Sequence, residues 1–403
     1  MLGTATTASK KIRRQIMVDS CNRIVFNTMK QNNPYLVGGY LRDLILGREG
    51  LDRDYSVSGN FKRNLATVAS KLKGKLIRIG KHDLYRIVLP DGTLLDFTPI
   101  KKNIEHDLLF RDFTINALAW SPQAGLTDVS QGLMDLGRNV IRMIRMENIL
   151  DDPIRILRAY RISNELSFFI EQNTRRTMRK LSPHIESAKH ERITSEFFRI
   201  LNAESCHVSL RELRDDGILN RIIIHNNKEL TVKIEEITRM QRILQSRHIS
   251  KRFDLTRVIS QGLNYRGLLH LEVLMKGLPK CHLSLSSLLQ KRLGLIERAS
   301  QITDFNRPPS RHMLFRLFCL MGDNASDYLI MNNQIKLLNK MDKYLKIDRE
   351  PLLSTDEIKA ITGLPEGILL GKVINDVKKR IFSNKIRTKG GAKRFLDKIK
   401  REI

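Results

Sequence analysis

Residues 36–43 run Leu-Val-Gly-Gly-Tyr-Leu-Arg-Asp, and residues 52–54 run Asp-Arg-Asp. The first stretch begins as a short apolar segment, stops at two glycines, and continues with helix-like spacing as far as Gly47. Glycines let backbone N–H groups approach an anion closely, and a helix N-terminus favours negative charge. Gly38 and Gly39, together with the guanidinium of Arg42 a few residues into the helix, therefore suit a polyphosphate site, although taken alone they are better explained as a Gly-Gly turn.

The two aspartates that follow predict a metal site. Residues 51–57 are strand-like, so Asp52 and Asp54 point to the same face. Two carboxylates this close are costly without a cation, and Mg²⁺ prefers such oxygens. Alone, they are better explained as solvent-facing acids on an edge strand. Placed shortly after the glycines, they predict two Mg²⁺ ions beside a triphosphate, as phosphoryl transfer requires.

A third carboxylate is expected from Asp96. It lies in a strand-like segment, 93–97, that follows the turn Pro90-Asp91-Gly92. This hairpin would lay Asp96 beside the first two acids, although an ordinary acid at a strand end is the alternative. Asp91 competes for the role, but the turn itself accounts for it.

The wider pattern predicts an α+β head followed by an all-α remainder. Strand-like segments lie at 75–79, 84–89 and 93–97, and helical spacing covers 61–73 and 107–119. These features predict a small mixed sheet with helices. From about residue 151 onward, strand signals are few and apolar residues recur at helical spacing.

The charge of the chain points to an anionic partner. The 71 Lys and Arg residues against 43 Asp and Glu give 403 residues a formal net charge of +28. Nucleic acid is the first expectation, an anionic membrane surface is the second, and a generally basic proteome explains the charge without any partner. The last thirty or so residues, from about Gly371, are especially basic; they predict either a solvated helix face or a contact with phosphates.

Other features bound the cellular setting. The four cysteines are scattered and form no CxxC pair, so we expect a reducing compartment and no zinc site. No apolar run reaches the roughly eighteen residues of a membrane span. Residues 1–17 are basic and lack acids, which suits either an RNA-contacting tail or an organellar presequence. We expect a cytoplasmic protein without a membrane partner, and the sequence predicts no particular protein partner.

Five ordered motifs over roughly residues 35–200 carry a family resemblance. The glycine and aspartate motif, taken together, resembles the nucleotidyltransferase core of bacterial-type (class II) CCA-adding enzymes and bacterial poly(A) polymerases. The rest of the series resembles that family's second motif, connector, base-reading motif and body helix at Arg111–Ala119, 128–142, Asp151–Ala159 and Glu191–Glu196. The C-terminal half resembles the family only weakly, around Pro351-Leu352-Leu353 and Gly363-Leu364-Pro365.

The resemblance implies a nucleotidyltransferase fold and a role for each motif. Asp52, Asp54 and Asp96 would hold the metals, and Gly38, Gly39 and Arg42 would hold the triphosphate. Arg111 and Asp112 would contact the ribose, and Asp152 and Arg155 would face the base. The remaining nucleotide-binding candidates are Asn116, Asp151 and Arg158.

Recognition of the base has a physical rationale. Residues i and i+3 of a helix share a face, so Asp152 and Arg155 present an acceptor beside donors. Cytosine and adenine each present an amino donor beside a ring-nitrogen acceptor, whereas uracil and guanine present the reverse order. One Asp–Arg pair would therefore accept CTP and ATP without a template. A structural salt bridge at a helix start is the alternative.

Three departures from the family pattern concern nucleotide choice. Phe110 stands where the second motif usually has Arg, and Asp151 stands where the base-reading motif usually has Glu. The third departure is a short connection, because few residues separate Asp96-Phe97 from the helix-like stretch that carries Arg111. Relatives with a shortened loop here tend to stop after CC, and a pocket that switches from C to A needs a moving element.

The sequence thus predicts an enzyme that adds C, A or both to the tRNA 3′ end. The short connection predicts restriction to CC; the alternative is that the loop is simply trimmed and another segment supplies the motion. The enzyme would hold the tRNA acceptor arm with basic residues of its later domains. A poly(A) polymerase and an inactive RNA-binding protein of the same fold are the alternatives. The expected division is a basic tail (1–20), catalytic head (21–120), neck (121–180), helical body (181–270) and basic helical tail (271–403).

Overall fold

The computed structural model describes residues 12–50, 52–80 and 83–402. The described chain divides into two compact units, one of residues 1–196 with 216–221 and the other of 197–215 with 222–403, apart from the residues outside that description. Residues 1–11 of the predicted N-terminal tail lie outside the described residues. Residues 12–18 are helical and Ile16 is buried, so this part of the expected tail belongs to the folded unit.

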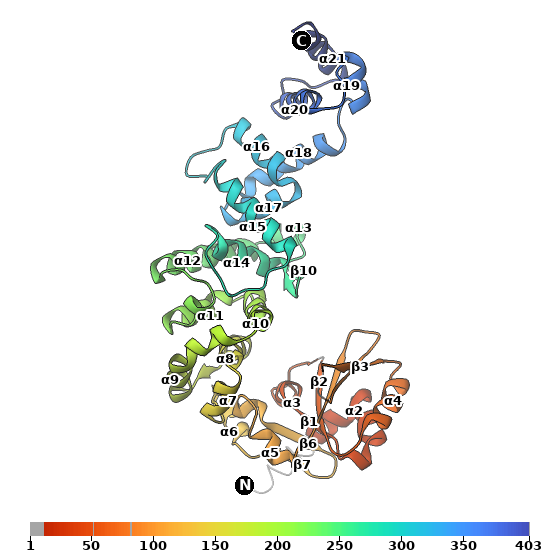
Figure 1. Ribbon diagram of the computed structural model, residues 1–403, viewed down its shortest axis with the longest axis vertical. Coiled ribbons are helices and arrows are strands. Elements are labelled where there is room, and N and C mark those ends of the chain that lie inside the picture. Colours follow the sequence, from red (N-terminus) through yellow and green to blue (C-terminus); the bar gives the residue numbers. More distant parts are fainter. Residues whose placement is uncertain (1–11, 51, 81–82, 403) are drawn as a thin grey trace. The chain divides into compact units, whose positions relative to one another are not determined.

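The first unit is built on a mixed seven-stranded sheet of order β3-β4-β5-β2-β1-β6-β7 (Figure 1). Only β2 and β5 pair in parallel. The strands are β1 (Tyr35–Val37), β2 (Arg53–Val57), β3 (Lys75–Ile79), β4 (Leu84–Val88), β5 (Leu94–Pro99), β6 (Leu118–Ser121) and β7 (Gly125–Asp128). The helices among them are α2 (Ser20–Thr28), α3 (Gly39–Ile45), α4 (Lys62–Lys71) and α5 (Ile104–Leu108).

Strand alternation gives this sheet one apolar face and one polar face. On the apolar face, the Tyr55 ring stacks on Phe97 at 5.0 Å and meets Phe26 of α2 edge-on at 6.1 Å. Phe61, which precedes α4, packs edge-on against Tyr85 at 5.9 Å. Helices α2 and α4 therefore cover this face, and the residues between these aromatics along β2 and β5 point to the other side.

The turn between β4 and β5 forms as predicted. Gly92 has φ of +87°, and the Thr93 amide donates to Asp91 Oδ1 at 2.9 Å. Asp91 is thus used by its turn, and the hairpin places β5 between β4 and β2.

The single helix expected over residues 107–119 is wrong. The segment contains the end of α5, a 3₁₀ turn at Thr114–Asn116 and then β6. Ala119 and Trp120 pair with Val37 and Leu36 of β1, and this strand pairing overrides the apolar spacing that suggested a helix. The sheet also continues through β7 to Asp128, beyond the expected end of the head at residue 120.

The rest of the first unit is mainly helical and follows the sheet directly. Its elements are α6 (Gly132–Gly137), β8 (Val140–Ile141), α7 (Met146–Asp151), α8 (Ile154–Leu166), β9 (Phe169–Ile170), α9 (Gln172–Leu181) and the start of α10 (His190–Asn202). Asp128 caps α6 by accepting from the amides of Gly132 at 2.8 Å and Leu133 at 2.9 Å. The connector motif thus begins with a helix cap.

The second unit is helical apart from the short pair β10 (Val258–Ser260) and β11 (Leu263–Asn264). Its α-helices after α10 are α11 (Cys206–Asp215), α12 (Asn227–Leu244), α13 (Arg247–Arg252), α14 (Tyr265–Met275), α15 (Ser287–Ser300), α16 (Arg311–Met321), α17 (Ala325–Met331), α18 (Leu338–Arg349), α19 (Thr355–Thr362), α20 (Ile368–Phe382) and α21 (Lys389–Glu402). The expected boundary at residue 270 falls inside α14, so no domain boundary lies there.

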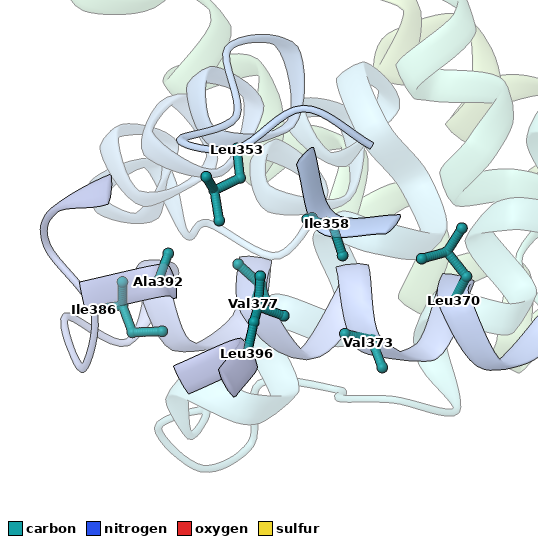
Figure 2. Packing of buried hydrophobic residues seen from close by; sticks show 8 residues of the cluster. All are labelled: Leu353, Ile358, Leu370, Val373, Val377, Ile386, Ala392 and Leu396. Carbon is teal, nitrogen blue, oxygen red and sulfur yellow. The ribbon is translucent and has the colours of Figure 1, made fainter. Parts of the chain in front are cut away.

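The last three helices share an apolar core, which Figure 2 shows. It contains Leu353, Ile358, Leu370, Val373, Val377, Ile386, Ala392 and Leu396. A capping box of Ser354 and Glu357 begins α19, and Gly363 ends it in the left-handed conformation. The basic C-terminal segment therefore has apolar contacts that order it. Among the described residues, no helix is both long enough and apolar enough to cross a membrane.

Candidate active site

The polar face of the sheet carries the predicted carboxylates. Asp96 on β5 lies directly opposite Asp54 on β2 in the parallel register, so both side chains share this face. Asp52 lies just before β2, and its Oδ1 accepts from the Leu94 amide at 3.3 Å. The hairpin thus places Asp96 opposite Asp54, as expected from the sequence.

Gly38 is required where the backbone passes Asp54. Its φ is +77° and its ψ is −150°, a conformation that is essentially restricted to glycine. A Cβ at this position would lie 2.9 Å from Asp54 Oδ2 and 3.7 Å from Arg111 Nη1. The glycine therefore leaves room for the carboxylate and for the N-terminus of α3 beside it.

The environment of Asp54 suits a bound cation. Burial raises the pKa of Asp54, the positive charge of Arg111 opposes this, and the negative charges of Asp96 and Asp52 raise it further. A cation bound to the oxygens would remove this penalty, and hard carboxylate oxygens are the donors that Mg²⁺ prefers. Within the described residues, however, no three acidic, histidine or cysteine side chains are arranged to hold a metal as they stand. Asp96 is turned to a different partner, Arg86, with 2.7 Å between Arg86 Nε and Asp96 Oδ1.

The guanidinium of Arg42, within α3, is held by hydrogen bonds to two side chains. Its Nε donates to Asp43 Oδ1 at 2.8 Å, and its Nη1 donates to Asn116 Oδ1 at 2.8 Å. Asn116 Nδ2 in turn donates to Asp112 Oδ1 at 2.9 Å. These bonds join the first motif to the second, and they hold the guanidinium in one orientation.

Asp112 connects the second motif to α8. Its Oδ2 accepts from Arg158 Nε at 2.8 Å, and its Oδ1 also accepts from the Phe113 amide at 2.8 Å. Burial alone would raise the pKa of Asp112, but the charge of Arg158 and these hydrogen bonds outweigh it and lower the pKa. Asp112 is therefore an ionised carboxylate that holds Arg158 in place.

The predicted base-reading pair, Asp152 and Arg155, lies at the start of α8. Asp152 Oδ2 accepts from Arg192 Nη2 at 2.8 Å, whereas its buried Oδ1 has no hydrogen-bond partner among the described residues. Arg155 Nε lies 3.9 Å from Asp152 Oδ2, and Arg155 Nη1 donates to the Phe110 carbonyl at 2.8 Å. The pair thus leaves one open acceptor beside a guanidinium with free donors.

One cavity of about 710 Å³, within the first unit, brings most of these groups together. This volume suits a nucleotide-sized ligand. The predicted residues that line it are Gly38, Gly39, Arg42, Asp52, Asp54, Arg111, Asp112, Asn116, Asp152, Arg155 and Arg158. Asp96 and Asp151 do not line it; Asp151 is the exposed last residue of α7.

Several side chains of the site were missed in the sequence. Arg161, Arg192 and Glu196 also line the cavity, and Glu196 Oε2 accepts from Arg161 Nε at 2.9 Å. Arg192 and Glu196 belong to the motif at Glu191–Glu196 on α10, which the sequence identified without giving it a role in the site, whereas Arg161 on α8 was not singled out. Arg86 was missed altogether, because one arginine in a strand carries no signal until the strands are paired.

The replacement of Arg by Phe at position 110 has a local explanation. The Arg145 guanidinium lies over the Phe110 ring at 4.5 Å, and the Phe110 carbonyl is the acceptor for Arg155. The contact with Arg155 is therefore made by the backbone of Phe110 and not by its side chain.

Two family profiles match the chain. "Poly A polymerase head domain" matches residues 34–142, and "Probable RNA and SrmB- binding site of polymerase A" matches residues 167–230. The first match covers the polar sheet face and the second motif, and the second covers the helices after α8.

Individual proteins agree with these profiles. The chain is 36% identical to a CC-adding tRNA nucleotidyltransferase of Synechocystis sp. over 48% of its own length and 47% of that protein. It is 27% identical to a CC-adding tRNA nucleotidyltransferase of Geobacter sulfurreducens over 90% of its length and 91% of that protein. The structure of a Thermotoga maritima CCA-adding enzyme complexed with tRNA shares the fold, with a TM-score of 0.72 at 21% identity over 96% of this chain and 97% of that one. The chain therefore contains a poly(A) polymerase head domain and the RNA-binding region that goes with it, and it is similar in sequence and fold to tRNA nucleotidyltransferases.

Proposed function

We propose that this enzyme adds C residues from CTP to the 3′ end of tRNA and stops after CC. The observation that carries the restriction to CC is the connection between β5, which ends at Pro99, and α5, which begins at Ile104. The four residues between them are tied at both ends. The Ile100 amide donates to the Val57 carbonyl at 2.8 Å, and Asn103 Oδ1 accepts from the His106 amide at 2.8 Å.

So short a connection leaves no long mobile loop between β5 and α5. Enlarging a base pocket from cytosine to adenine needs a moving element, and loops with room to move are the usual ones. The Synechocystis and Geobacter proteins, which are CC-adding by name, support the same restriction.

The residues of the cavity suit nucleotidyl transfer. Arg42 and the amides at the start of α3 would bind the triphosphate, and Arg111 would lie at its reacting end, beside Asp54. Asp52, Asp54 and Asp96 would hold two Mg²⁺ ions, which would supply charge stabilisation and an activated 3′-hydroxyl. Attack of that hydroxyl on the α-phosphate forms the new phosphodiester and releases pyrophosphate.

Selection of the base would fall to Asp152 and Arg155. The open Oδ1 of Asp152 would accept from the cytosine amino group, and Arg155 would donate to the ring nitrogen. Arg192 would position Asp152 by holding its other oxygen. Uracil presents a carbonyl to the carboxylate, which leaves a buried acceptor unpaired and is rejected for that reason.

The test uses tRNA transcripts that lack CCA, end in C, or end in CC, each with a single nucleotide. We expect CTP to be added to the first two, and ATP to be added slowly or not at all to the third. ATP addition to the CC end at a rate comparable to CTP addition would refute the restriction. Extension of an unstructured RNA by ATP alone would favour a poly(A) polymerase, and no incorporation at all would favour an inactive RNA-binding protein.

A further inference from the structure

Arg86 lies on the polar face of the sheet among the three carboxylates. It is on β4, directly opposite Asp96 in the antiparallel register, and Asp96 lies directly opposite Asp54 on the other side. Directly opposed residues point to the same face of a sheet. The order across this face is therefore Arg86, Asp96 and Asp54.

The contact of Arg86 with Asp96 occupies both carboxylate oxygens. Arg86 Nε donates to Asp96 Oδ1 at 2.7 Å, and Arg86 Nη2 donates to Asp96 Oδ2 at 2.7 Å. This is the bidentate geometry in which a guanidinium binds a carboxylate most strongly. The pair is only half-buried, with 36% of the Arg86 side chain and 22% of the Asp96 side chain exposed, so water weakens it and a competing cation can reach it.

The charge of Arg86 also acts on the other two acids. Its pKa is raised, first by the hydrogen bond to Asp96 and then, against the opposing effect of burial, by the charges of Asp96, Asp52 and Asp54. Arg111 lies on the far side of Asp54, as the position of its Nη1 beside Gly38 shows. In the described part of the head, Arg86 and Arg111 thus lie on either side of the neighbouring carboxylates Asp96 and Asp54.

We propose that Arg86 is a positioning residue that acts as an internal counter-cation for Asp96 and competes with the divalent cation for this carboxylate. This inference rests on the proposed metal-dependent function. When the metal binds, Arg86 gives up at least one oxygen of Asp96, so the metal affinity of the free protein is lower than the carboxylates alone would give. A merely structural ion pair at the sheet surface would leave this affinity unchanged.

The probe is Mn²⁺ alone, titrated into the full-length protein without nucleotide and followed by electron paramagnetic resonance of the free ion. Arg86→Gln removes the competing charge, and we expect Mn²⁺ to bind on the order of tenfold more tightly. That is the effect of removing one positive charge about 6 Å from a double charge in a water-like dielectric. Arg86→Lys keeps the charge but loses the two-pronged contact, so its dissociation constant should lie between those of the wild type and Arg86→Gln.

Arg78→Gln is the matched control. Arg78 on β3 neighbours Ile77, the residue opposite Arg86, and therefore points to the other face of the sheet, where it pairs with the exposed Asp83. The Arg78→Gln substitution removes one positive charge from the same sheet, as Arg86→Gln does, so the Mn²⁺ affinity of this variant should equal that of the wild type. Thermal unfolding in EDTA shows whether each variant is folded. If Arg86→Gln is not folded, the Mn²⁺ affinity of Arg86→Lys is the test.

Unchanged or weaker Mn²⁺ binding in Arg86→Gln, or an equal gain in Arg78→Gln, would overturn the inference. Failure of the proposed function gives a different result. In that case the wild type adds no CTP to tRNA in Mg²⁺, whatever Arg86→Gln does to Mn²⁺ binding. Asp54→Asn should weaken Mn²⁺ binding in both the wild-type and Arg86→Gln backgrounds, because it removes a ligand from the same site.

Discussion

Replacing Gly38 with alanine tests how closely the backbone is matched to Asp54, a carboxylate of the proposed metal site. The added Cβ would lie 2.9 Å from Asp54 Oδ2, which is about half an ångström inside ordinary contact. The carboxylate is partly buried and flanked by Arg111, so either Asp54 or the start of α3 must shift. Both belong to the proposed metal and triphosphate site.

Two separate effects follow from this substitution. The backbone conformation, with φ of +77° and ψ of −150°, is expected to cost a non-glycine residue roughly 1–3 kcal/mol of folding free energy. Displacing a reacting group by about 1 Å can cost about a hundredfold in rate. For a shift of half that size, we expect CTP addition to fall by about ten- to a hundredfold.

The control variant is Gly47→Ala. Gly47 also has a positive φ, +71°, but an added Cβ there would meet no atom within 4 Å. Thermal unfolding should show a loss of stability in both variants, whereas single-turnover CTP addition at saturating Mg²⁺ should be impaired only in Gly38→Ala. Equal activities for the two variants would refute the proposed coupling between Gly38 and Asp54.

The further predictions concern three individual side chains. Asp54→Asn should lower CTP addition by at least about a thousandfold while leaving tRNA binding in a filter assay unchanged. The same variant should melt at a higher temperature than the wild type in EDTA at neutral pH. Because the pKa of Asp54 is raised in the folded protein, its ionised form destabilises the fold, increasingly so as pH rises from the usual carboxylate range through the raised pKa. An equal or lower melting temperature would contradict this. Arg155→Ala should reduce discrimination against UTP by about ten- to a hundredfold, measured as a ratio of kcat/KM values, and unchanged selectivity in a folded variant would assign Arg155 a structural role. Arg192→Gln should raise the KM for CTP more than Arg221→Gln, which removes an exposed ion pair with Glu186 elsewhere in the same unit.

The parts of the fold that depend on local chemistry were predictable from the sequence. The glycines before α3, the hairpin turn at residues 90–92 and the alternation along β2 and β5 each impose a conformation through a few neighbouring residues. They were enough to predict that Asp96 would lie beside Asp54, because a hairpin of this length can return its second strand to the sheet.

The stretch from residue 107 to 119 shows where this reasoning fails. Its apolar spacing suits a helix, but Leu118, Ala119 and Trp120 are buried because β6 pairs with β1 inside the sheet. This pairing depends on contacts with residues some eighty positions earlier. Sequence periodicity contains no information about such a partner.

The partners of the charged residues were hidden for the same reason. Motif residues could be assigned as acids or bases, but the structure shows that nearly every one of them is already paired. Arg42 is held by Asp43 and Asn116, and Arg158 is held by Asp112.

These internal pairs bear on how the enzyme would bind its substrates. A guanidinium that is already fixed by a carboxylate loses little conformational freedom when it binds a phosphate, so affinity is gained by preorganisation. The same pairing reduces the net charge that the nucleotide meets, so tight binding requires the metal ions to add positive charge. Asp152 differs from these paired groups, because one of its oxygens is held by Arg192 and the other is left open. A buried open acceptor is costly until a donor fills it, and the amino group of the correct base is the donor that the proposed reaction supplies.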